Sequence, residues 1–213
     1  MLNLKHEQYQ LIIKQITKHI NEYFKINNVG TAIIGLSGGV DSTLAAKLCI
    51  LALGKENVIG VLMPEIGLSK QQNINDAKEF AEKEGIKYLL QPINKMLISY
   101  DLAKINLKAR VRANILYSYA NTFNALVIGT GNKTEAMVGY GTKYGDLACD
   151  IFVIGDLYKK EVFELAKYLK LSENIINKTP TAELFEGQTD EQELGISYEE
   201  LDNSELDSVD ENS

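Results

Sequence analysis

Eight residues near the start of the chain combine glycine flexibility with hydroxyl donors and one carboxylate. They are Gly35, Leu36, Ser37, Gly38, Gly39, Val40, Asp41 and Ser42. Adjacent glycines let the backbone approach a ligand without a Cβ clash. The start of a following helix offers free N–H groups and a positive dipole end, and the two serines add hydroxyl donors. These residues therefore predict a phosphate site.

Asp41 is the member of this loop that a phosphate would repel unless a cation lay between them. Mg²⁺ is commonly held by one or two carboxylates together with phosphate oxygens. Glu135 could supply a second carboxylate from residues 129–146, a stretch with five glycines. Loops this long inside a compact domain are usually functional. Lys143 and Asp146 on the same stretch are candidates for contact with a second substrate.

Three cationic side chains could also face an anionic ligand. Arg110 and Arg112 lie two residues apart on a predicted helix, so they point in different directions. One of them could face the ligand while the other is structural. Lys159 lies in the first turn of another predicted helix, where the dipole disfavours a cation, so it would be better used on an anion.

The elements that position these residues alternate between strands and helices along the chain. Strands are predicted at residues 31–34, 57–63, 86–92 and 125–129, and helices at 4–26, 43–53, 69–84, 100–121 and from 156. Ser69 and Gln72 predict a capping box for the third helix. This alternation predicts an α/β fold, an open parallel sheet with helices on both faces. Because ligands bind beyond the carboxyl ends of such strands, residues 35–42 and 130–135 could share one site.

The charge of the chain is unevenly distributed. The net charge is −7, but residues 183–213 hold 12 of the 29 acidic residues and none of the 22 lysines and arginines. Residues 1–182 therefore carry 17 acids against 22 bases, a mildly basic body that suits phosphate-bearing ligands. We expect residues 1–182 to form the catalytic domain and residues 183–213 to be an acidic, loosely structured segment of the same domain. No basic cluster interleaved with aromatic residues favours nucleic acid.

Composition also bears on the compartment. No apolar run approaches the ~20 residues that cross a membrane, and the first residues are polar and amphipathic rather than a signal peptide. Cys49 and Cys149 are too far apart to indicate a disulfide framework or a metal cluster, and Cys49 is expected in the core. These features predict a cytoplasmic protein.

The loop is neither a Walker A motif nor a dinucleotide fingerprint. Ser37-Gly-Gly-Val-Asp-Ser42 resembles the pyrophosphate loop of the ATP pyrophosphatases, which cleave ATP between its α and β phosphates and adenylate a substrate. A longer series of motifs, covering most of residues 1–202, looks like NAD synthetase. After the loop come Ala-Arg-Val-Arg, Gly-Thr-Gly-Asn-Lys-Thr-Glu, Thr-Lys-Tyr-Gly-Asp, Leu-Tyr-Lys-Lys, Lys-Thr-Pro-Thr-Ala-Glu-Leu and Gln-Thr-Asp-Glu-Gln-Glu-Leu-Gly.

The resemblance implies a Rossmann-like sheet of the ATP pyrophosphatase type and the conversion of deamido-NAD to NAD, with ATP and Mg²⁺. It implies free ammonia as the nitrogen donor, because no amidase domain fits here, and a homodimer. The resemblance implies that ATP is contacted by Gly35 to Ser42, Thr130, Lys159 and Thr181. It implies that Mg²⁺ is held by Asp41 and Glu135. It implies that deamido-NAD is contacted by Arg110, Tyr140, Lys143 and Asp150. We assign catalytic roles to Asp41, Lys159 and Asp146.

Two other hypotheses stay open. One is another adenylating ATP pyrophosphatase, of the tRNA-modifying or the amidotransferase type. The thiolating enzymes usually need paired reactive cysteines, which Cys49 and Cys149 do not resemble. The other is a non-catalytic ATP-binding module. The family usually carries a His-Lys pair near its C-terminus that helps close the site over deamido-NAD, and Asp210-Glu-Asn-Ser213 contains no such pair.

Overall fold

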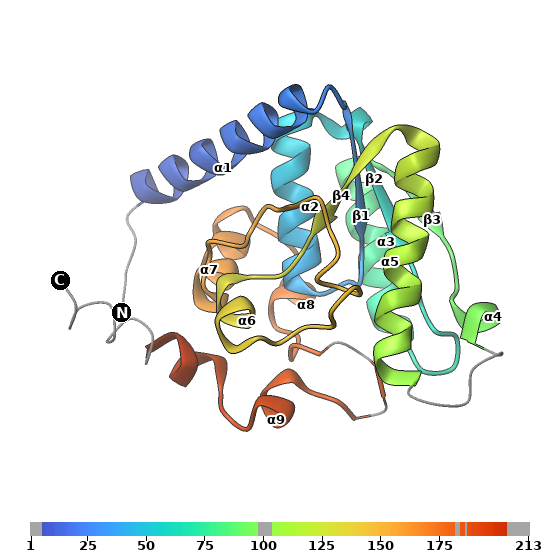
Figure 1. Ribbon diagram of the computed structural model, residues 1–213. Coiled ribbons are helices and arrows are strands. Elements are labelled where there is room, and N and C mark those ends of the chain that lie inside the picture. The colour runs from blue at the N-terminus through green and yellow to red at the C-terminus, as the bar shows by residue number, and fades with distance from the viewer. Residues whose placement is uncertain (1–5, 98–103, 182–183, 186, 204–213) are drawn as a thin grey trace.

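A computed structural model describes residues 6–97, 104–181, 184–185 and 187–203 of the chain. Within these ranges the strands form one parallel sheet in the order β3-β2-β1-β4-β5 (Figure 1). The strands are β1 (Thr31–Gly35), β2 (Val58–Leu62), β3 (Lys87–Leu90), β4 (Ala125–Gly129) and β5 (Ile151–Phe152). In the central register, Ile33 of β1 lies opposite Ile59 of β2 and Val127 of β4. The predicted α/β fold is confirmed.

The strands bury side chains on both faces, which is why their sequences are continuously apolar rather than alternating. Ala32 and Ile34 join one core, and Ile33 joins the other. The first core packs against α1 (His6–Ile26), α2 (Val40–Leu53), α3 (Gln71–Glu84), α7 (Lys159–Tyr168) and α8 (Glu173–Ile176). The second core packs against α4 (Asn94–Leu97) and α5 (Lys104–Phe123). Accordingly, α2 and α5 lie on opposite sides of the sheet (Figure 1).

Several predicted details can be compared with the structure. Cys49 is fully buried, as predicted, and burial raises its pKa to about 12. The predicted capping box is wrong. The Ser69 hydroxyl instead accepts a hydrogen bond from the Glu65 N–H, at 3.1 Å, and α3 begins at Gln71 with no side-chain cap. Residues 4–5 and 100–103 of the predicted helices lie outside the described residues.

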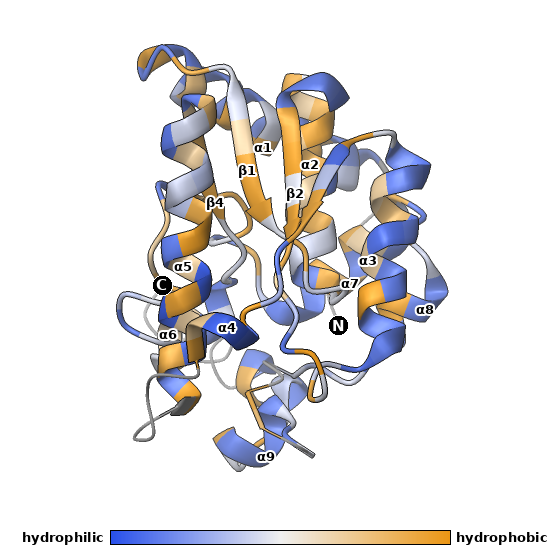
Figure 2. Cartoon of the chain, turned by 90° about the vertical axis from the view of Figure 1, so that its right-hand side faces the viewer, coloured by the Kyte–Doolittle hydropathy of each residue, from blue (hydrophilic) through white to orange (hydrophobic). Residues whose placement is uncertain are grey.

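Short elements were missed because so few residues carry little periodic signal. The glycine-rich stretch after β4 contains a helix, α6 (Lys133–Val138), and β5 has only two residues. A 3₁₀ helix, η1 (Lys55–Asn57), precedes β2, and α9 (Asp190–Leu194) lies in the acidic segment. Figure 2 shows α2 and β2 as largely hydrophobic and α9 as largely hydrophilic. No described helix is both long and apolar enough to cross a membrane.

The position of the site follows from the order of the strands. The chain leaves β1 toward β2 and β3 on one side, and β4 pairs with β1 on the other side. The direction of winding therefore reverses between β1 and β4, and in open α/β sheets such a reversal opens a crevice at the carboxyl ends of the strands. The loop after β1 and helix α6 after β4 both start at this edge.

Candidate active site

A cavity of about 540 Å³ opens at this edge of the sheet. Its walls come from the loop after β1, the end of β2, the start of α3, one side of α5 and the stretch from β4 to residue 148. Residues 178–181, Leu184 and two acids of α9 complete them. A volume of this size is typical of small-molecule sites. The loops predicted to share a site, residues 35–42 and 130–135, both contribute to the wall.

The loop after β1 is held in shape by its own hydroxyls. The hydroxyls of Ser37 and Ser42 lie 3.1 Å apart, and that of Ser42 also donates to the Gly39 carbonyl at 3.1 Å. The Gly39 N–H donates to the Ser37 hydroxyl at 3.2 Å. We expected both serines to serve as donors to a ligand. In this structure they stabilise the loop.

The N-terminus of α2 is directed at the cavity. Gly39 is its N-cap and no side chain caps it, so the first-turn N–H groups can serve an anion. Gly38 has a φ of +80°, and a Cβ there would lie 2.3 Å from the Asn73 carbonyl oxygen in the first turn of α3. Only glycine fits this approach, which brings α3 directly against the loop.

The central cluster joins α2, α6 and α7. The Lys159 Nζ lies 2.6 Å from Asp41 Oδ2 and 3.6 Å from Glu135 Oε1. Asn132 donates from Nδ2 to Asp41 Oδ1 at 3.1 Å and forms a capping box with Glu135 at the start of α6. The fold therefore brings three charged side chains to one point, although up to 118 positions of the chain separate them; they are Asp41, Glu135 and Lys159.

The charges of this cluster influence one another. Burial, and next the charge of Asp41, raise the pKa of Glu135 to about 7. Burial alone would lower the pKa of Lys159, but the neighbouring carboxylates Asp41 and Glu135 outweigh burial and raise it. Lys159 is 1% exposed, so its ammonium is a permanent positive charge held against two acids.

Three further predicted residues line the cavity. Thr130 follows β4, and Thr181 lies on the segment after α8. Tyr140 lies on the loop after α6, and its hydroxyl lies 3.1 Å from Asp190 Oδ1 and 2.6 Å from Glu193 Oε2, within hydrogen-bond distance of both carboxylates. Burial raises the pKa of Tyr140, so it stays a phenol. The ring of Tyr140 is thereby fixed by the acidic segment.

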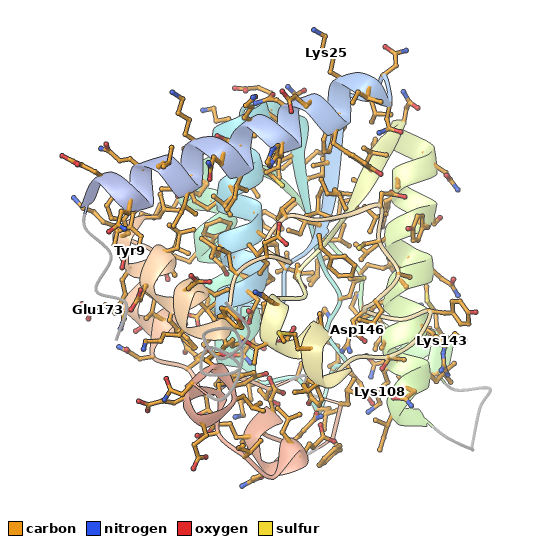
Figure 3. The ribbon with its side chains drawn as sticks, turned by 60° about the vertical axis from the view of Figure 1, so that its left-hand side comes forward. Tyr9, Lys25, Lys108, Lys143, Asp146 and Glu173 are labelled. Carbon is orange, nitrogen blue, oxygen red and sulfur yellow. The ribbon has the colours of Figure 1, made fainter. Side chains whose placement is uncertain are left out.

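The other predicted substrate residues lie at the rim or beyond it. Asp146 lines the cavity and accepts from the Thr142 N–H at 3.0 Å. Arg110, Lys143 and Asp150 are not among the described residues that line it. Arg110 donates to the Lys143 carbonyl at 3.2 Å, linking α5 to the loop on which Lys143 and Asp146 lie (Figure 3). The Asp150 carboxylate accepts from the Val127 N–H at 2.7 Å, a contact within the fold.

Two further residues line the cavity, and a third contacts the central cluster. Lys178 forms an ion pair with the buried Asp76 and donates to the Gly38 carbonyl at 2.9 Å, so it braces the loop. It lies in the quoted motif Lys-Thr-Pro-Thr-Ala-Glu-Leu, which could have indicated it. The sequence predicts that one of Arg110 and Arg112 faces the ligand, and in the structure Arg112 lines the cavity, where its Nε donates to the Met63 carbonyl at 3.2 Å. Tyr198 is not among the described residues that line the cavity, but its hydroxyl lies 3.1 Å from Asp190 Oδ2 and 3.4 Å from Glu135 Oε1, and no motif pointed to it.

This arrangement suits a reaction at a polyphosphate. The helix N-terminus offers N–H donors for phosphate oxygens, and the two carboxylates offer hard oxygen ligands for a divalent cation. Among the described residues no nucleophilic thiol lies on the cavity wall. Catalysis here would therefore depend on positioning and electrostatic stabilisation.

Comparison with known proteins gives a consistent result. The family model described as NAD synthase matches residues 12–212. The chain is 47% identical to the NH₃-dependent NAD⁺ synthetase of Methanocaldococcus jannaschii over 92% of this chain and 80% of that protein. It is 50% identical to the NH₃-dependent NAD⁺ synthetase of Methanococcus aeolicus over 84% of this chain and 77% of that protein.

Solved structures are similar as well. The NMN synthetase of Francisella tularensis matches with a TM-score of 0.87 at 35% identity, over 94% of this chain and 86% of that one. The NH₃-dependent NAD synthetase of Campylobacter jejuni, in complex with the nitrate ion, matches with a TM-score of 0.75 at 42% identity, over 80% of this chain and 77% of that one.

Proposed function

This chain belongs to the NAD synthase family, and from that membership we propose that it amidates deamido-NAD to NAD with ammonia and ATP. The observation that carries the proposal is the cluster of Asp41, Glu135 and Lys159 beside an uncapped helix N-terminus in one cavity. The reaction has two steps, an adenylation and an ammonolysis.

In the first step a carboxylate oxygen of the nicotinate attacks the α-phosphorus of ATP. An acyl-adenylate forms, and the bond between the α and β phosphates breaks to release pyrophosphate. Residues Gly35 to Ser42 would bind the phosphates through the N–H groups at the start of α2. Lys159 would stabilise negative charge that develops on the phosphates, and Thr130 and Thr181, which line the same cavity, would contact ATP.

The donor set of the cluster fits Mg²⁺. Asp41 and Glu135 both line the cavity, and their side chains are 21% and 18% exposed, so an oxygen of each can face a cation. Burial, and next the charge of Asp41, raise the pKa of Glu135, so a second carboxylate lies close enough to share a cation with it. When bound, the cation would withdraw charge from phosphate oxygens. Asp41 and Glu135 would hold it, and Asn132 would keep Asp41 oriented through its 3.1 Å hydrogen bond.

In the second step ammonia attacks the carbonyl carbon of the acyl-adenylate. The bond from the acyl carbon to the AMP oxygen breaks, AMP leaves, and the ammonium-derived nitrogen loses a proton to give the amide. Water competes with ammonia for the same carbon, so the cavity must exclude water. Tyr140 lines the cavity from the loop after α6, and its hydrogen bonds with Asp190 and Glu193 hold it in place.

The second substrate would lie along the loop 139–150. We propose Arg110, Tyr140, Lys143 and Asp150 as contacts to deamido-NAD, and Asp146 as a residue that acts near the acyl group. Lys143 is exposed and Asp146 lines the cavity, which supports contact with a ligand that extends from the cavity to the surface. We also propose a homodimer and a cytoplasmic location. Four exposed apolar side chains support association: Met137 and Val138 on α6, Leu147 on the loop after it, and Phe152 on the edge strand β5.

A second acceptor has a specific observation in its favour. One of the similar structures is an NMN synthetase, and it covers 94% of this chain. The corresponding acceptor would be nicotinate mononucleotide, which carries the same reacting carboxylate without the adenylyl half. The chemistry at Asp41, Glu135 and Lys159 would be the same for both acceptors, so only an assay can separate them.

The deciding experiment is pyrophosphate exchange into ATP with Mg²⁺, with deamido-NAD, with nicotinate mononucleotide and with neither, followed by ammonia. Exchange that depends on deamido-NAD, followed by NAD formation, supports the proposal. Exchange that depends on the mononucleotide alone moves the assignment to the second acceptor. ATP binding with no exchange under any condition favours a non-catalytic ATP-binding module, and stimulation by tRNA would favour a tRNA-modifying enzyme.

Asp41→Asn tests the metal assignment in the same assay. Removing the charge while keeping the shape should lower exchange about 100-fold or more, because a metal contact is worth several kcal/mol in the transition state. Asp156→Asn is the matched control, since Asp156 is an exposed carboxylate three residues before Lys159. Activity of Asp41→Asn equal to that of the control would contradict the assignment.

A further inference from the structure

Asp202 is a buried carboxylate in the acidic segment, far from the predicted site in sequence. It is 1% exposed, and a fully buried Asp is rare unless its charge is compensated. Residues 198–203 are helical and bring it to the start of α7. No motif in the sequence singles it out, and the proposed reaction does not require it to touch a substrate.

Both carboxylate oxygens of Asp202 have partners on the elements that carry the central cluster. Oδ2 accepts from the Lys160 N–H at 2.8 Å, and Oδ1 accepts from the Thr134 hydroxyl at 2.5 Å. The Thr134 oxygen in turn accepts from the Lys159 N–H at 2.9 Å. One carboxylate thus satisfies two N–H groups in the first turn of α7, one directly and one through Thr134.

These contacts fix two backbones relative to each other. Thr134 immediately precedes Glu135 on α6, and Lys159 is the first residue of α7. The Lys133 N–H also donates to the Leu157 carbonyl at 2.8 Å, which holds the same two segments together. The distance from Lys159 Nζ to Glu135 depends on how α6 and α7 are spaced, and the contacts of Asp202 and Thr134 join these two helices next to both residues. A carboxylate at the N-terminus of α7 is also favoured by the helix dipole.

We propose that Asp202 is a positioning residue for the adenylation step, acting through Thr134 and Lys160 to hold Lys159 against Asp41 and Glu135. The kinetic part of this inference rests on the proposed function. The structural part does not, because it concerns the placement of Lys159 in the protein alone.

The kinetic test compares Asp202→Ala and Asp202→Asn in pyrophosphate exchange. For Asp202→Ala we expect kcat to fall about 10- to 100-fold with less than about a threefold change in KM for ATP, because displacement of a reacting group by about 1 Å costs rate of that order. Asp202→Asn keeps an acceptor for the Lys160 N–H and should retain more activity. It also serves as the informative variant if Asp202→Ala does not fold.

A double-mutant cycle tests the route through Thr134. Thr134→Val removes the hydroxyl with little change of shape. If Asp202 and Thr134 act as one unit, the double variant should be no slower than the slower single variant. Additive losses in kcat would show that Asp202 does not act through Thr134 and would overturn the inference.

A second measurement needs no turnover. Amine acetylation followed by mass spectrometry reports the accessibility of each lysine, and Lys159 should be protected in the native protein. In Asp202→Ala the labelling of Lys159 should rise severalfold relative to Lys18, whose side chain is 69% exposed. Unchanged protection of Lys159 with native kcat in Asp202→Ala would overturn the proposal.

The control variant is Glu84→Gln, which breaks the Lys47–Glu84 ion pair between α2 and α3, away from the cavity. It should lower the melting temperature without changing kcat or the labelling of Lys159. If it lowered kcat as much as Asp202→Ala does, general destabilisation would explain the effect and the positioning role would fail. A native protein that is inactive with every acceptor would refute the proposed function, and the labelling would still decide the role of Asp202.

Discussion

Lys159 shows how a single side chain can depend on residues from the whole chain. Its ammonium is buried, and it lies 4.8 Å from the centre of the Tyr198 ring as well as next to Asp41 and Glu135. A buried ammonium without partners would lose its proton, because desolvation disfavours the charged form. Here the two carboxylates raise the pKa of Lys159 and keep its ammonium charged beside a phosphate site.

The first prediction concerns the pH dependence of stability. Burial and the charge of Asp41 raise the pKa of Glu135 from 4.5 to about 7, so the folded protein retains this proton where the unfolded chain has lost it. The contribution of Glu135 to the free energy of unfolding is therefore full below pH 4.5 and is lost as the pH rises to about 7. Glu135→Gln lacks this dependence.

Thermal unfolding in the presence of a chelator, between pH 4.5 and 8, checks this prediction. The melting temperature of the native protein minus that of Glu135→Gln should fall as the pH rises and become constant above about pH 7. Parallel curves for the two proteins would contradict the raised pKa.

The second prediction separates a capping role from a role in the site. Asn132→Ala removes the N-cap of α6 and the hydrogen bond to Asp41. Thr189→Ala removes only the N-cap of α9. Each should lower the free energy of unfolding by about 1 kcal/mol, the usual cost of losing a cap. Asn132→Ala alone should also lower the rate of pyrophosphate exchange, by about tenfold or more, because Asp41 loses its orienting donor. Equal rates in the two variants would count against that role.

At the scale of elements, the phosphate loop is supported by three segments. Helix α2 follows the loop, the first turn of α3 packs on Gly38, and Lys178 donates to the Gly38 carbonyl. Asp76 on α3 pairs with Lys178, so α3 supports the loop both directly and through this lysine. The loop is thus preformed, which lowers the entropy cost of binding a phosphate.

The third prediction tests this close approach. Gly38 and Gly67 both have positive φ, of +80° and +97°, but a Cβ at Gly67 would meet nothing within 4 Å. Gly67→Ala should therefore cost only the backbone strain, about 1–2 kcal/mol. Gly38→Ala should cost more, because the added Cβ must displace the Asn73 carbonyl. It should also abolish ATP binding, which isothermal calorimetry measures. Normal ATP binding by Gly38→Ala would contradict the packing.

At the scale of the molecule, the sheet separates two cores and the acidic segment covers the polar edge. Asp190, Tyr198 and Asp202 are all at most 6% exposed, and each contacts the central cluster or its support. The described part of the acidic segment is thus packed against the site. The division of the chain at residue 182 stays a prediction.

The fourth prediction concerns the assembly. One chain has a mass of 23.7 kDa, so a homodimer, at twice that value, should give about 47 kDa in sedimentation equilibrium. We expect Phe152→Ser, which removes an exposed apolar side chain at the edge strand β5, to shift the equilibrium toward the monomer if this edge is part of the interface. A native mass near 23.7 kDa at micromolar concentration would contradict the homodimer.

The sequence by itself determined the strands, the larger helices, the parallel sheet and the loop residues, because these depend on local periodicity and on glycine positions. It also brought Asp41, Glu135 and Lys159 into one hypothesis through recognisable motifs. Tertiary structure decided the rest. The capping box at Ser69 failed because its hydroxyl found the Glu65 N–H instead, and β5 was too short to carry a pattern.

Tyr198 and Asp202 owe their roles to contacts across long separations, such as the 68 positions between Thr134 and Asp202. A single sequence carries no local signal for such pairs. These residues come close to their partners only after the sheet has brought the ends of its strands together. Their polar groups are then buried, and buried polar groups must form hydrogen bonds with one another.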